Sequence, residues 1–270
     1  MGAFIRQPAV AGRFYPSRPE VLLRDLRSYT VAEGDKLRAL GCVVPHAGYM
    51  YSGHVAGAVY ARLELPRRFI ILCPNHTGMG QPLAVMSQGR WLTPLGEVPV
   101  DTALASALLR ECRLLSEDSL AHRAEHALEV QLPFLQSLLG EFTFVPITLG
   151  VGRFESLQEL GQAMARVLGR EKEGALIVAS SDMNHYESDS VTRVKDQKAI
   201  EQLLALDPRG LYEVVTREDI SMCGYGPAVA MLTAARQLGA QTAQLIKYGT
   251  SGDVSGDRNM VVGYAGVAVM

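Results

Sequence analysis

The stretch GALIVASSDMNHY, residues 174–186, decides the fold class of this chain. Its first part is short, apolar and bounded by polar residues, which predicts a buried strand over 174–182. Polar residues follow at once, and Asp182 and His185 stand where this strand ends. Buried apolar strands are typical of a parallel sheet that is covered on both faces. Ligands bind such sheets beyond the carboxyl ends of the strands.

The same alternation of strands and helices extends outward from this stretch in both directions. It predicts further strands over 40–45, 68–74, 83–87, 142–150, 243–249 and 261–269. It predicts helices over 54–65, 102–112, 126–139, 155–169, 190–206, 208–216 and 226–239, with Pro133 kinking or restarting the third. The glycine- and serine-rich segment 250–259 reads as a turn between two strands. We therefore expect an α/β fold: a single three-layer α/β/α domain over 1–270 with a mostly parallel central sheet.

Composition narrows the class of protein. The chain has 270 residues, is 48% hydrophobic and carries 26 basic against 28 acidic side chains. This is the balance of a globular protein, and it argues against a nucleic-acid partner, which would call for a basic surface. The N-terminus has no signal-peptide pattern, and the longest apolar run is shorter than the roughly 20 residues that a membrane span needs. The four cysteines form no CxxC pair, which is typical of reduced thiols in a cytoplasmic protein.

Polar clusters follow three of the predicted strands. His46 follows the strand over 40–45, His76 follows the strand over 68–74, and His185 follows the strand over 174–182. A fourth cluster contains Cys223 and precedes the helix over 226–239. The unpaired N–H groups of a helix N-terminus favour thiolate, so we expect a lowered pKa for Cys223.

Two imidazoles and a thiolate can serve as three ligands of a metal ion with an open position, as in catalytic sites. Imidazole suits zinc, iron, copper and nickel, while thiolate favours softer ions. A further histidine is then free for proton transfer, and Asp182 can orient or charge-stabilise His185. The competing interpretation is that these histidines are hydrogen-bonded loop residues and Cys223 a small buried side chain. We expect Cys42, Cys73 and Cys112 to belong to the core.

A second pattern competes with the strand-end clusters. His122, Glu125 and His126 match H-x-x-E-H, the inverted motif of a family of zinc peptidases. On a helix, His122 and His126 would share one face. The match is short, lacks an identified third ligand and does not explain the strand-end clusters. Zinc metallopeptidase is therefore a weaker alternative, and Glu125 and His126 are expected at the rim of the main pocket.

Segments along nearly the whole chain resemble the Memo family in the family's order. They are IRQPAVAGRFYPS, VPHAGYMYSG, PNHTG, WLTPLGEVPVD, AEHALEVQLPFLQ, SSDMNHY, MCGYGPAVAML and VVGYAG. Prokaryotic members are also called the AmmeMemoRadiSam system protein B, a name that implies AMMECR-type and radical SAM proteins as partners. The resemblance further implies a fold similar to class III extradiol dioxygenases, which are non-haem iron enzymes.

The resemblance also implies roles for individual residues. Those dioxygenases hold iron with two histidines and a carboxylate, and here His46, His76 and Cys223 stand at the corresponding positions. His185 stands at the position of a catalytic acid/base histidine and is accompanied by Asp182. Residues of the matching motifs expected to line the pocket are Phe14, Tyr51 and Asn75. Because a thiol replaces the carboxylate, ring-cleaving activity does not carry over with the fold.

Two classes of function stay open from the sequence. The first is a metal-dependent oxidoreductase that uses iron or copper, with zinc as a further option. The second is a non-catalytic module that binds a peptide or a partner protein in the same cleft. The resemblance supports both, since it implies phosphotyrosine-peptide binding and metal-linked redox activity in the eukaryotic branch. Aromatic residues near the first cluster, among them Tyr49 and Tyr51, favour the second class.

Overall fold

A nine-stranded sheet forms the centre of the protein, and a small three-stranded sheet lies beside it. The computed structural model describes residues 4–31 and 33–270. The order of the large sheet is β10-β12-β2-β9-β3-β8-β4-β7, with β11 paired to β12. Its strands are β2 (Gly41–Val44), β3 (Arg68–Pro74), β4 (Leu83–Val85), β7 (Ser116–Glu117), β8 (Thr143–Leu149), β9 (Leu176–Ser180), β10 (His185–Glu187), β11 (Ala243–Thr250) and β12 (Val261–Val269).

The middle of this sheet is parallel, as the apolar strands predict. β2, β9, β3 and β8 run parallel to one another in that spatial order. The strand direction changes on both sides of this middle, because β12 pairs antiparallel with β2 and β4 pairs antiparallel with β8, while β7 at the outer edge is parallel to β4. The carboxyl ends of β2, β9 and β3 therefore meet at one edge, where polar residues follow each strand.

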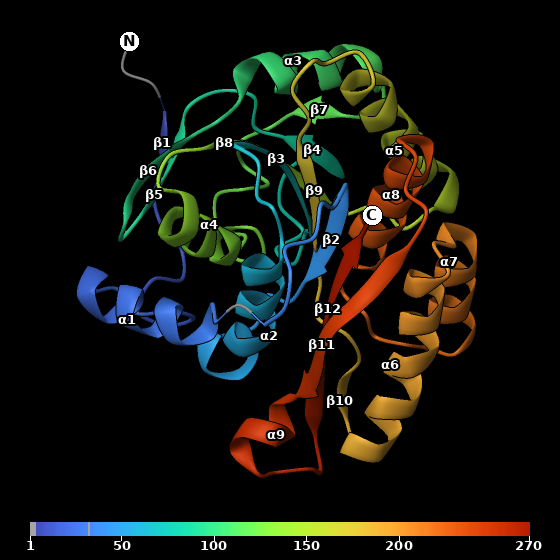
Figure 1. The fold of residues 1–270 in the computed structure, drawn as a ribbon. Coiled ribbons are helices and arrows are strands. Elements are labelled where there is room, and N and C mark those ends of the chain that lie inside the picture. The colour runs from blue at the N-terminus through green and yellow to red at the C-terminus, as the bar shows by residue number, and fades with distance from the viewer. Residues whose placement is uncertain (1–3, 32) are drawn as a thin grey trace.

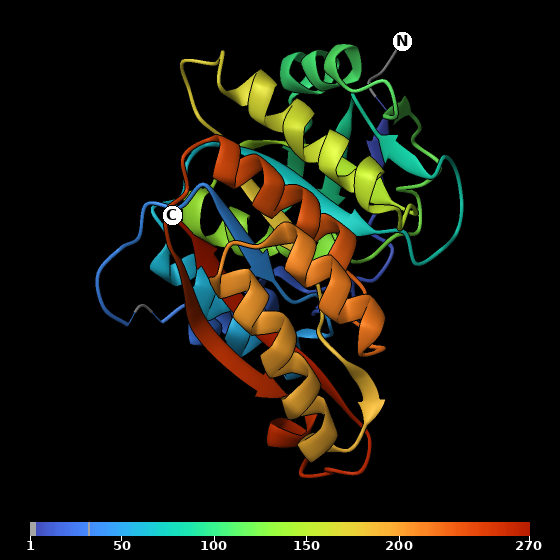
Figure 2. The same ribbon diagram turned by 90° about the vertical axis from the view of Figure 1, so that its right-hand side faces the viewer.

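Helices cover both faces of the sheet (Figure 1). Turning the molecule brings the layer with α5, α8, α6 and α7 to the front (Figure 2). The helices are α1 (Pro19–Tyr29), α2 (Tyr49–Arg62), α3 (Thr102–Glu111), α4 (Leu132–Leu139), α5 (Phe154–Leu168), α6 (Asp189–Leu204), α7 (Pro208–Arg217), α8 (Tyr225–Gln237) and α9 (Ser251–Ser255). One apolar cluster packs beneath α3, α5, α6, α7 and α8, and another beneath α1, α2 and α4. This is the expected three-layer arrangement.

Several elements differ from the sequence-based expectation. α1 and the hairpin of β5 (Arg90–Thr93) and β6 (Gly96–Pro99) were not predicted, nor was β1 (Ile5–Arg6), which pairs with β5. The segment over 250–259 does connect two strands, but it contains the short helix α9. The helix predicted over 126–139 begins only at Leu132, after the 3-10 turn η1 (Glu129–Gln131), and Pro133 lies in its first turn, where proline is tolerated.

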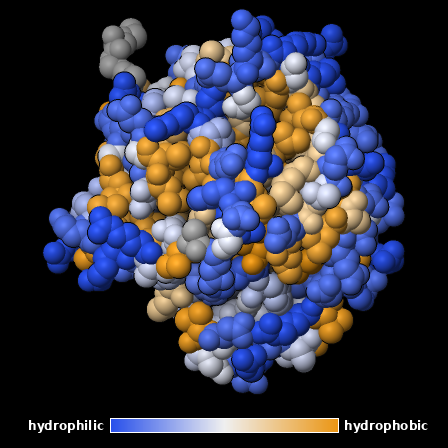
Figure 3. Space-filling view, viewed as in Figure 1, coloured by the Kyte–Doolittle hydropathy of each residue, from blue (hydrophilic) through white to orange (hydrophobic). Residues whose placement is uncertain are grey.

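The face of the protein seen in Figure 3 carries both hydrophilic and hydrophobic residues. On this face, hydrophobic residues form separate patches interrupted by hydrophilic ones. None of the helices in the described part of the chain is both long and apolar enough to cross a membrane. Cys42, Cys73 and Cys112 are fully buried, as expected of core residues, whereas Cys223 is partly accessible.

Candidate metal centre

Three neighbouring parallel strands deliver the predicted residues to one place. His46 follows β2, His76 follows β3, and Asp182 follows β9. They line a cavity of about 640 Å³ at the carboxyl edge of the sheet. The complete lining is Phe14, His46, Ala47, Gly48, His76, His126, Asp182, His185, Tyr186, Ser221, Cys223 and Val262.

The atoms of three side chains converge in the wall of this cavity. One nitrogen of His46, one nitrogen of His76 and the sulfur of Cys223 all lie within 4.8 Å of one another. Cys223 Sγ lies 3.2 Å from His46 Nε2. Ligand atoms around a four-coordinate ion with bonds of about 2.0–2.3 Å lie at separations of this order. Two imidazole nitrogens and one sulfur are thus a donor set that fits a transition metal.

Hydrogen bonds determine which ring nitrogen of His46 has a lone pair available for a metal ion. Ser180 Oγ donates its proton to the carbonyl oxygen of Ala127 at 2.6 Å. Because its own proton is used in this way, Ser180 Oγ must accept from His46 Nδ1 at 3.0 Å and from Gln131 Nε2 at 2.9 Å. With Nδ1 protonated, the lone pair of neutral His46 is on Nε2, which faces Cys223. Such partners of the second ring nitrogen are common behind metal-binding histidines.

A buried carboxylate orients His76 in the same way. His76 Nδ1 donates to Glu125 Oε1 at 2.9 Å, and the backbone N–H of His76 donates to Oε2 at 2.6 Å. Ala127 N–H also donates to Oε1. Burial would raise the pKa of Glu125, but these hydrogen bonds and the charge of His76 lower it to about 2. Glu125 is therefore ionised, and His76 presents Nε2 as a ligand atom.

Cys223 reaches His46 because a glycine follows it. A Cβ on Gly224 would lie 2.4 Å from the carbonyl oxygen of Ser180, so no larger residue fits between this segment and β9. Burial raises the pKa of the Cys223 thiol, and the charge of Asp182 raises it further. The expected lowering by the helix N-terminus is thus wrong, because desolvation outweighs the helix N–H groups. Cys223 is a thiol until a metal displaces its proton.

Asp182 orients His46 rather than His185. Its Oδ1 accepts from the backbone N–H groups of His46 at 2.8 Å and Ala47 at 3.3 Å. Its Oδ2 lies 3.9 Å from His46 Nε2, and burial raises the pKa of this carboxyl. Within the described residues it forms no hydrogen bond with His185. Asp182 therefore holds the His46 loop by hydrogen bonds, and its predicted electrostatic interaction with His185 is retained, because the charge of His185 opposes the effect of burial on the pKa of Asp182.

His185 is held by the segment that carries the cysteine. Its Nδ1 donates to the carbonyl oxygen of Ser221 at 2.8 Å, and its backbone N–H donates to Ser221 Oγ at 2.7 Å. The tautomer is again set, so neutral His185 keeps its lone pair on Nε2. An imidazole with one engaged nitrogen and one free nitrogen can accept or donate a proton.

Two of the other predicted pocket residues line the cavity directly. Phe14 contacts His126, with ring centroids 4.7 Å apart. His126 stacks on His76, with centroids 4.7 Å apart and ring planes 24° apart. Glu125 lies behind His76 and is fully buried, so it supports the wall instead of forming a rim.

The remaining two predicted residues lie outside this cavity. Asn75 shapes the loop after β3, where its Oδ1 accepts from Thr77 Oγ1 and from the backbone N–H of Gly78. It lines a smaller hollow of about 290 Å³ that also reaches His76 and Cys223. Tyr51 lies in the first turn of α2 and does not belong to the cavity lining.

The zinc-peptidase motif is not formed. Residues 122–126 lie in a turn and loop rather than on a helix, so His122 and His126 share no helix face. His122 is fully buried, and its Nδ1 lies 2.8 Å from Thr148 Oγ1. In the described part of the chain it belongs to neither candidate group of metal ligands, whereas His126 joins His76 and Glu125 in the second group.

Three supporting residues were missed by the sequence reasoning. Ser180 and Gln131 fix the tautomer of His46, and Ser221 fixes that of His185. Gln131 is fully buried, and a polar residue inside the apolar run ALEVQLPFL is the signal that could have revealed it. Ser180 and Ser221 adjoin the predicted clusters, but nothing in their local sequence shows which side chain they contact.

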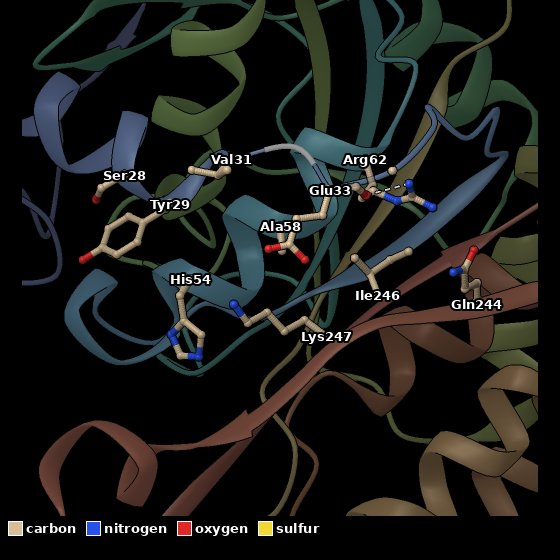
Figure 4. A pocket seen from close by; sticks show the side chains of 11 residues that line it. Ser28, Tyr29, Val31, Glu33, His54, Ala58, Arg62, Gln244, Ile246 and Lys247 are labelled. Carbon is tan, nitrogen blue, oxygen red and sulfur yellow. Dashed lines mark hydrogen bonds between the residues drawn. The ribbon is translucent and has the colours of Figure 1, made fainter.

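A larger hollow lies away from these residues, between α2 and β11 (Figure 4). We call it the α2–β11 groove; its volume is about 700 Å³. Its lining is Ser28, Tyr29, Val31, Glu33, Gly34, His54, Ala58, Arg62, Gln244, Ile246 and Lys247. A register shift between Leu245 and Lys247 leaves Ile246 as an extra residue in β11, and Ile246 and Lys247 both face the groove. None of the residues predicted for the site lies here.

Comparison with known proteins identifies the family. The model of the Memo-like protein family matches residues 6–268. A MEMO1 family protein of Methanosarcina barkeri is 45% identical over 269 residues, covering 98% of this chain and 100% of the relative. One of Methanopyrus kandleri is 43% identical over 276 residues, covering 97% of this chain and 98% of the relative.

Among solved structures, an uncharacterized protein of Escherichia coli K12 has a similar fold. The TM-score is 0.59 with 14% sequence identity, and the match covers 86% of this chain and 100% of that one. At this identity the likeness concerns the fold alone. The match of the family model and the identity to the archaeal relatives extend over nearly the full length, so the chain belongs to the Memo family.

Proposed function

We propose that the strand-end cavity binds a redox-active transition metal, iron or copper, through His46 Nε2, His76 Nε2 and Cys223 Sγ. Zinc is the further option that this donor set accommodates. The proposal rests on one observation: three donor atoms lie within 4.8 Å of one another, and both imidazoles have Nδ1 engaged by a buried partner. When bound, such an ion would supply Lewis acidity and electron transfer.

The residues around this donor set favour a metal-dependent oxidoreductase. Three protein ligands would leave a bound ion with coordination positions for a further ligand, and the cavity of about 640 Å³ that these residues line is large enough for a small molecule. The ring of Phe14 favours a planar, catechol-like substrate. His185 Nε2 would accept or donate a proton on this substrate, and Asp182 would hold the His46 loop and add negative charge beside it.

The experiment is a metal analysis of protein purified without oxygen or chelator. We expect about one equivalent of iron or copper in the unmodified protein and loss of that metal in His46→Ala and Cys223→Ser. His54→Ala is the matched control, since His54 lies on α2 in the groove and should leave the metal content unchanged. Metal-free unmodified protein that also fails to take up added Fe²⁺ or Cu⁺, or equal metal in all variants, would contradict the proposal.

A specific observation also favours a second function, binding of a peptide in the same cleft. Tyr186 lines the cavity and is 69% exposed. It is held at φ 61°, a conformation that costs energy for a residue other than glycine. An exposed aromatic side chain held in this way is suited to contact a peptide or one of the partners that the resemblance implies, AMMECR-type and radical SAM proteins.

The two functions can be separated with the metal-loaded protein. Oxygen consumption with a catechol-like probe, lost in His185→Ala, would support the oxidoreductase. Calorimetric binding of a tyrosine-phosphorylated peptide that weakens in Tyr186→Ala, without oxygen consumption, would support the binding module instead.

A further inference from the structure

A second buried carboxyl lies behind the loop that carries His185. Asp196 is on α6 and is fully buried. Its Oδ1 accepts from the backbone N–H of Asn184 at 2.8 Å, and its Oδ2 accepts from the hydroxyl of Tyr248 on β11 at 2.7 Å. The carboxyl thus links the residue before His185 to an edge of the large sheet. It lies outside the cavity and has no part in the proposed metal chemistry.

The backbone around Asp196 is built to accommodate this contact. A Cβ on Gly263 of β12 would lie 1.8 Å from Asp196 Oδ2, so only glycine leaves room for the carboxyl. The backbone of Gly263 also accepts from Met183 N–H and donates to the carbonyl oxygen of Asn184, both at 2.9 Å. The loop before His185 is therefore fixed on two sides, by β12 and by Asp196.

Hydrogen bonds continue from this loop to the imidazole of His185. Asn184 Oδ1 accepts from both the backbone N–H and the hydroxyl of Ser221 at 3.1 Å. The carbonyl oxygen of Ser221 in turn accepts from His185 Nδ1 at 2.8 Å. A continuous path thus runs from the carboxyl of Asp196 through Asn184 and Ser221 to the side chain that faces the cavity.

We propose that Asp196 is a positioning residue for His185, acting through Asn184 and Ser221, and that its protonation state sets how firmly the imidazole is held. An ionised carboxyl accepts strongly from both Asn184 and Tyr248. A protonated carboxyl is a weaker acceptor, so the contact with the backbone N–H of Asn184 weakens, and only the Tyr248 hydroxyl can turn to accept the carboxyl proton. The inference rests on the proposed function only in treating His185 as the proton-transfer group.

Burial of Asp196 places this change of protonation state near neutral pH. Burial raises the pKa of Asp196 to about 7, while the hydrogen bonds from Tyr248 and Asn184 and the charge of Arg193 act in the opposite direction. The groups that face the carboxyl are Tyr248 from β11, Arg193 from α6 itself and only backbone from β12 and the 183–184 loop. Arg193 in turn pairs with Asp189 and Asp253.

The test follows two NMR signals of the full-length, metal-free protein between pH 5 and pH 9. The backbone amide of Asn184 reports on Asp196 directly, and the ring protons of His185 report on the path. We expect the chemical shift of the Asn184 amide to change with a midpoint near pH 7, as Asp196 ionises, and the ring signals of His185 to show an inflection at the same midpoint. Asp196→Asn should remove this inflection from both signals. Glu201→Gln, an exposed carboxyl on the same helix, should leave both unchanged.

If Asp196→Asn does not fold, Tyr248→Phe provides the same test, because loss of one donor should raise both midpoints together. A pH-dependent shift of the Asn184 amide signal without a matching inflection in the His185 ring signals would overturn the proposal. So would an inflection that persists in Asp196→Asn, or midpoints that do not move in Tyr248→Phe. No metal is present in these measurements, so failure of metal binding would not affect the result.

Discussion

The strand-end cavity and the α2–β11 groove are of similar size, but they differ in how their polar groups are held. The cavity measures about 640 Å³ and the groove about 700 Å³. In the cavity, His46, His76 and His185 each have Nδ1 engaged by a hydrogen-bond partner. In the groove, Arg62 Nη1 donates to the carbonyl oxygen of Glu33, but the side chains of Lys247 and Gln244 form no hydrogen bond or ion pair among the residues described. Preorganised donors, rather than volume, therefore distinguish the candidate site.

The difference follows from where each hollow lies in the fold. The cavity lies at the ends of adjacent parallel strands, where buried backbone and side chains supply partners on every side. The groove lies between one helix and an edge strand, and its charged groups are on long flexible chains that water can solvate. If this contrast governs metal binding and stability, substitutions at the cavity should change both more than substitutions in the groove.

The largest effect should come from displacing Cys223 without changing it. Gly224→Ala places a Cβ 2.4 Å from the carbonyl oxygen of Ser180 and 2.4 Å from the Cβ of Ser181, so the backbone beside Cys223 must shift. We expect metal binding to be lost and the free energy of unfolding to fall by about 1–3 kcal/mol. Metal titration and chemical denaturation measure the two effects.

The control for this variant is Gly174→Ala, where a Cβ would meet no atom within 4 Å. It should bind metal normally. Unchanged binding in Gly224→Ala as well would mean that the position of Cys223 is not needed for the site.

The next effect is a pH dependence of the free energy of unfolding that arises from Asp196. This residue lies between the two regions and contacts both β11 and the His185 loop. Its pKa is raised from 3.8 in the unfolded chain to about 7 in the folded protein. The folded state then holds the proton more tightly, so this contribution to stability is complete below pH 4 and is lost as the pH rises through 7.

Denaturation curves between pH 4 and pH 8 measure this dependence. Asp196→Asn should flatten the curve over that range, since the amide does not titrate. If the two proteins lose stability in parallel as the pH rises, another group is responsible and Asp196 does not titrate near neutral pH.

A partial loss of metal affinity should follow when Glu125, the hydrogen-bond partner of His76, loses its charge. Glu125→Gln keeps the shape of the side chain but removes the charge that orients and polarises the imidazole. Loss of such a partner typically weakens metal affinity by about 10–100-fold. Competition titration with Zn²⁺ and a chelating dye measures the change, with Glu64→Gln as an exposed control. Equal affinity in both variants would show that the hydrogen bond to Glu125 does not tune the site.

The strands that precede the site residues could be predicted from the sequence more fully than the hydrogen bonds that orient the side chains of these residues. The runs before His46, His76 and Asp182 are apolar and short, so their ends were visible as changes in polarity. The predicted start of the helix at residue 126 was wrong, because tertiary contacts compete there with the hydrogen bonds of a helix. Arg6 donates to the carbonyl oxygen of Glu125, and the side chain of Glu125 accepts from His76 and Ala127.

The pKa of Cys223 shows why the local sequence was not sufficient for the electrostatics. The position before a helix suggested a lowered pKa, but burial depends on the whole fold and reverses the direction. The same holds for Asp182, whose nearest histidine in sequence is His185 but whose hydrogen bonds go to the loop of His46. Spacing along the chain identified the residues, and only the three-dimensional structure assigned their partners.

The smallest change in stability and metal affinity should come from a substitution in the α2–β11 groove. Lys247→Ala removes an exposed charge that has no partner among the described residues, so stability should change by less than about 0.5 kcal/mol. Metal affinity should be unchanged, because no hydrogen bond joins the side chain of Lys247 to the donor set or its partners within residues 4–31 and 33–270. Denaturation and the same competition titration check both values. A loss of affinity as large as that of Glu125→Gln would break the contrast between the two hollows, because the groove would then be coupled to the site through β11, whose Tyr248 contacts Asp196.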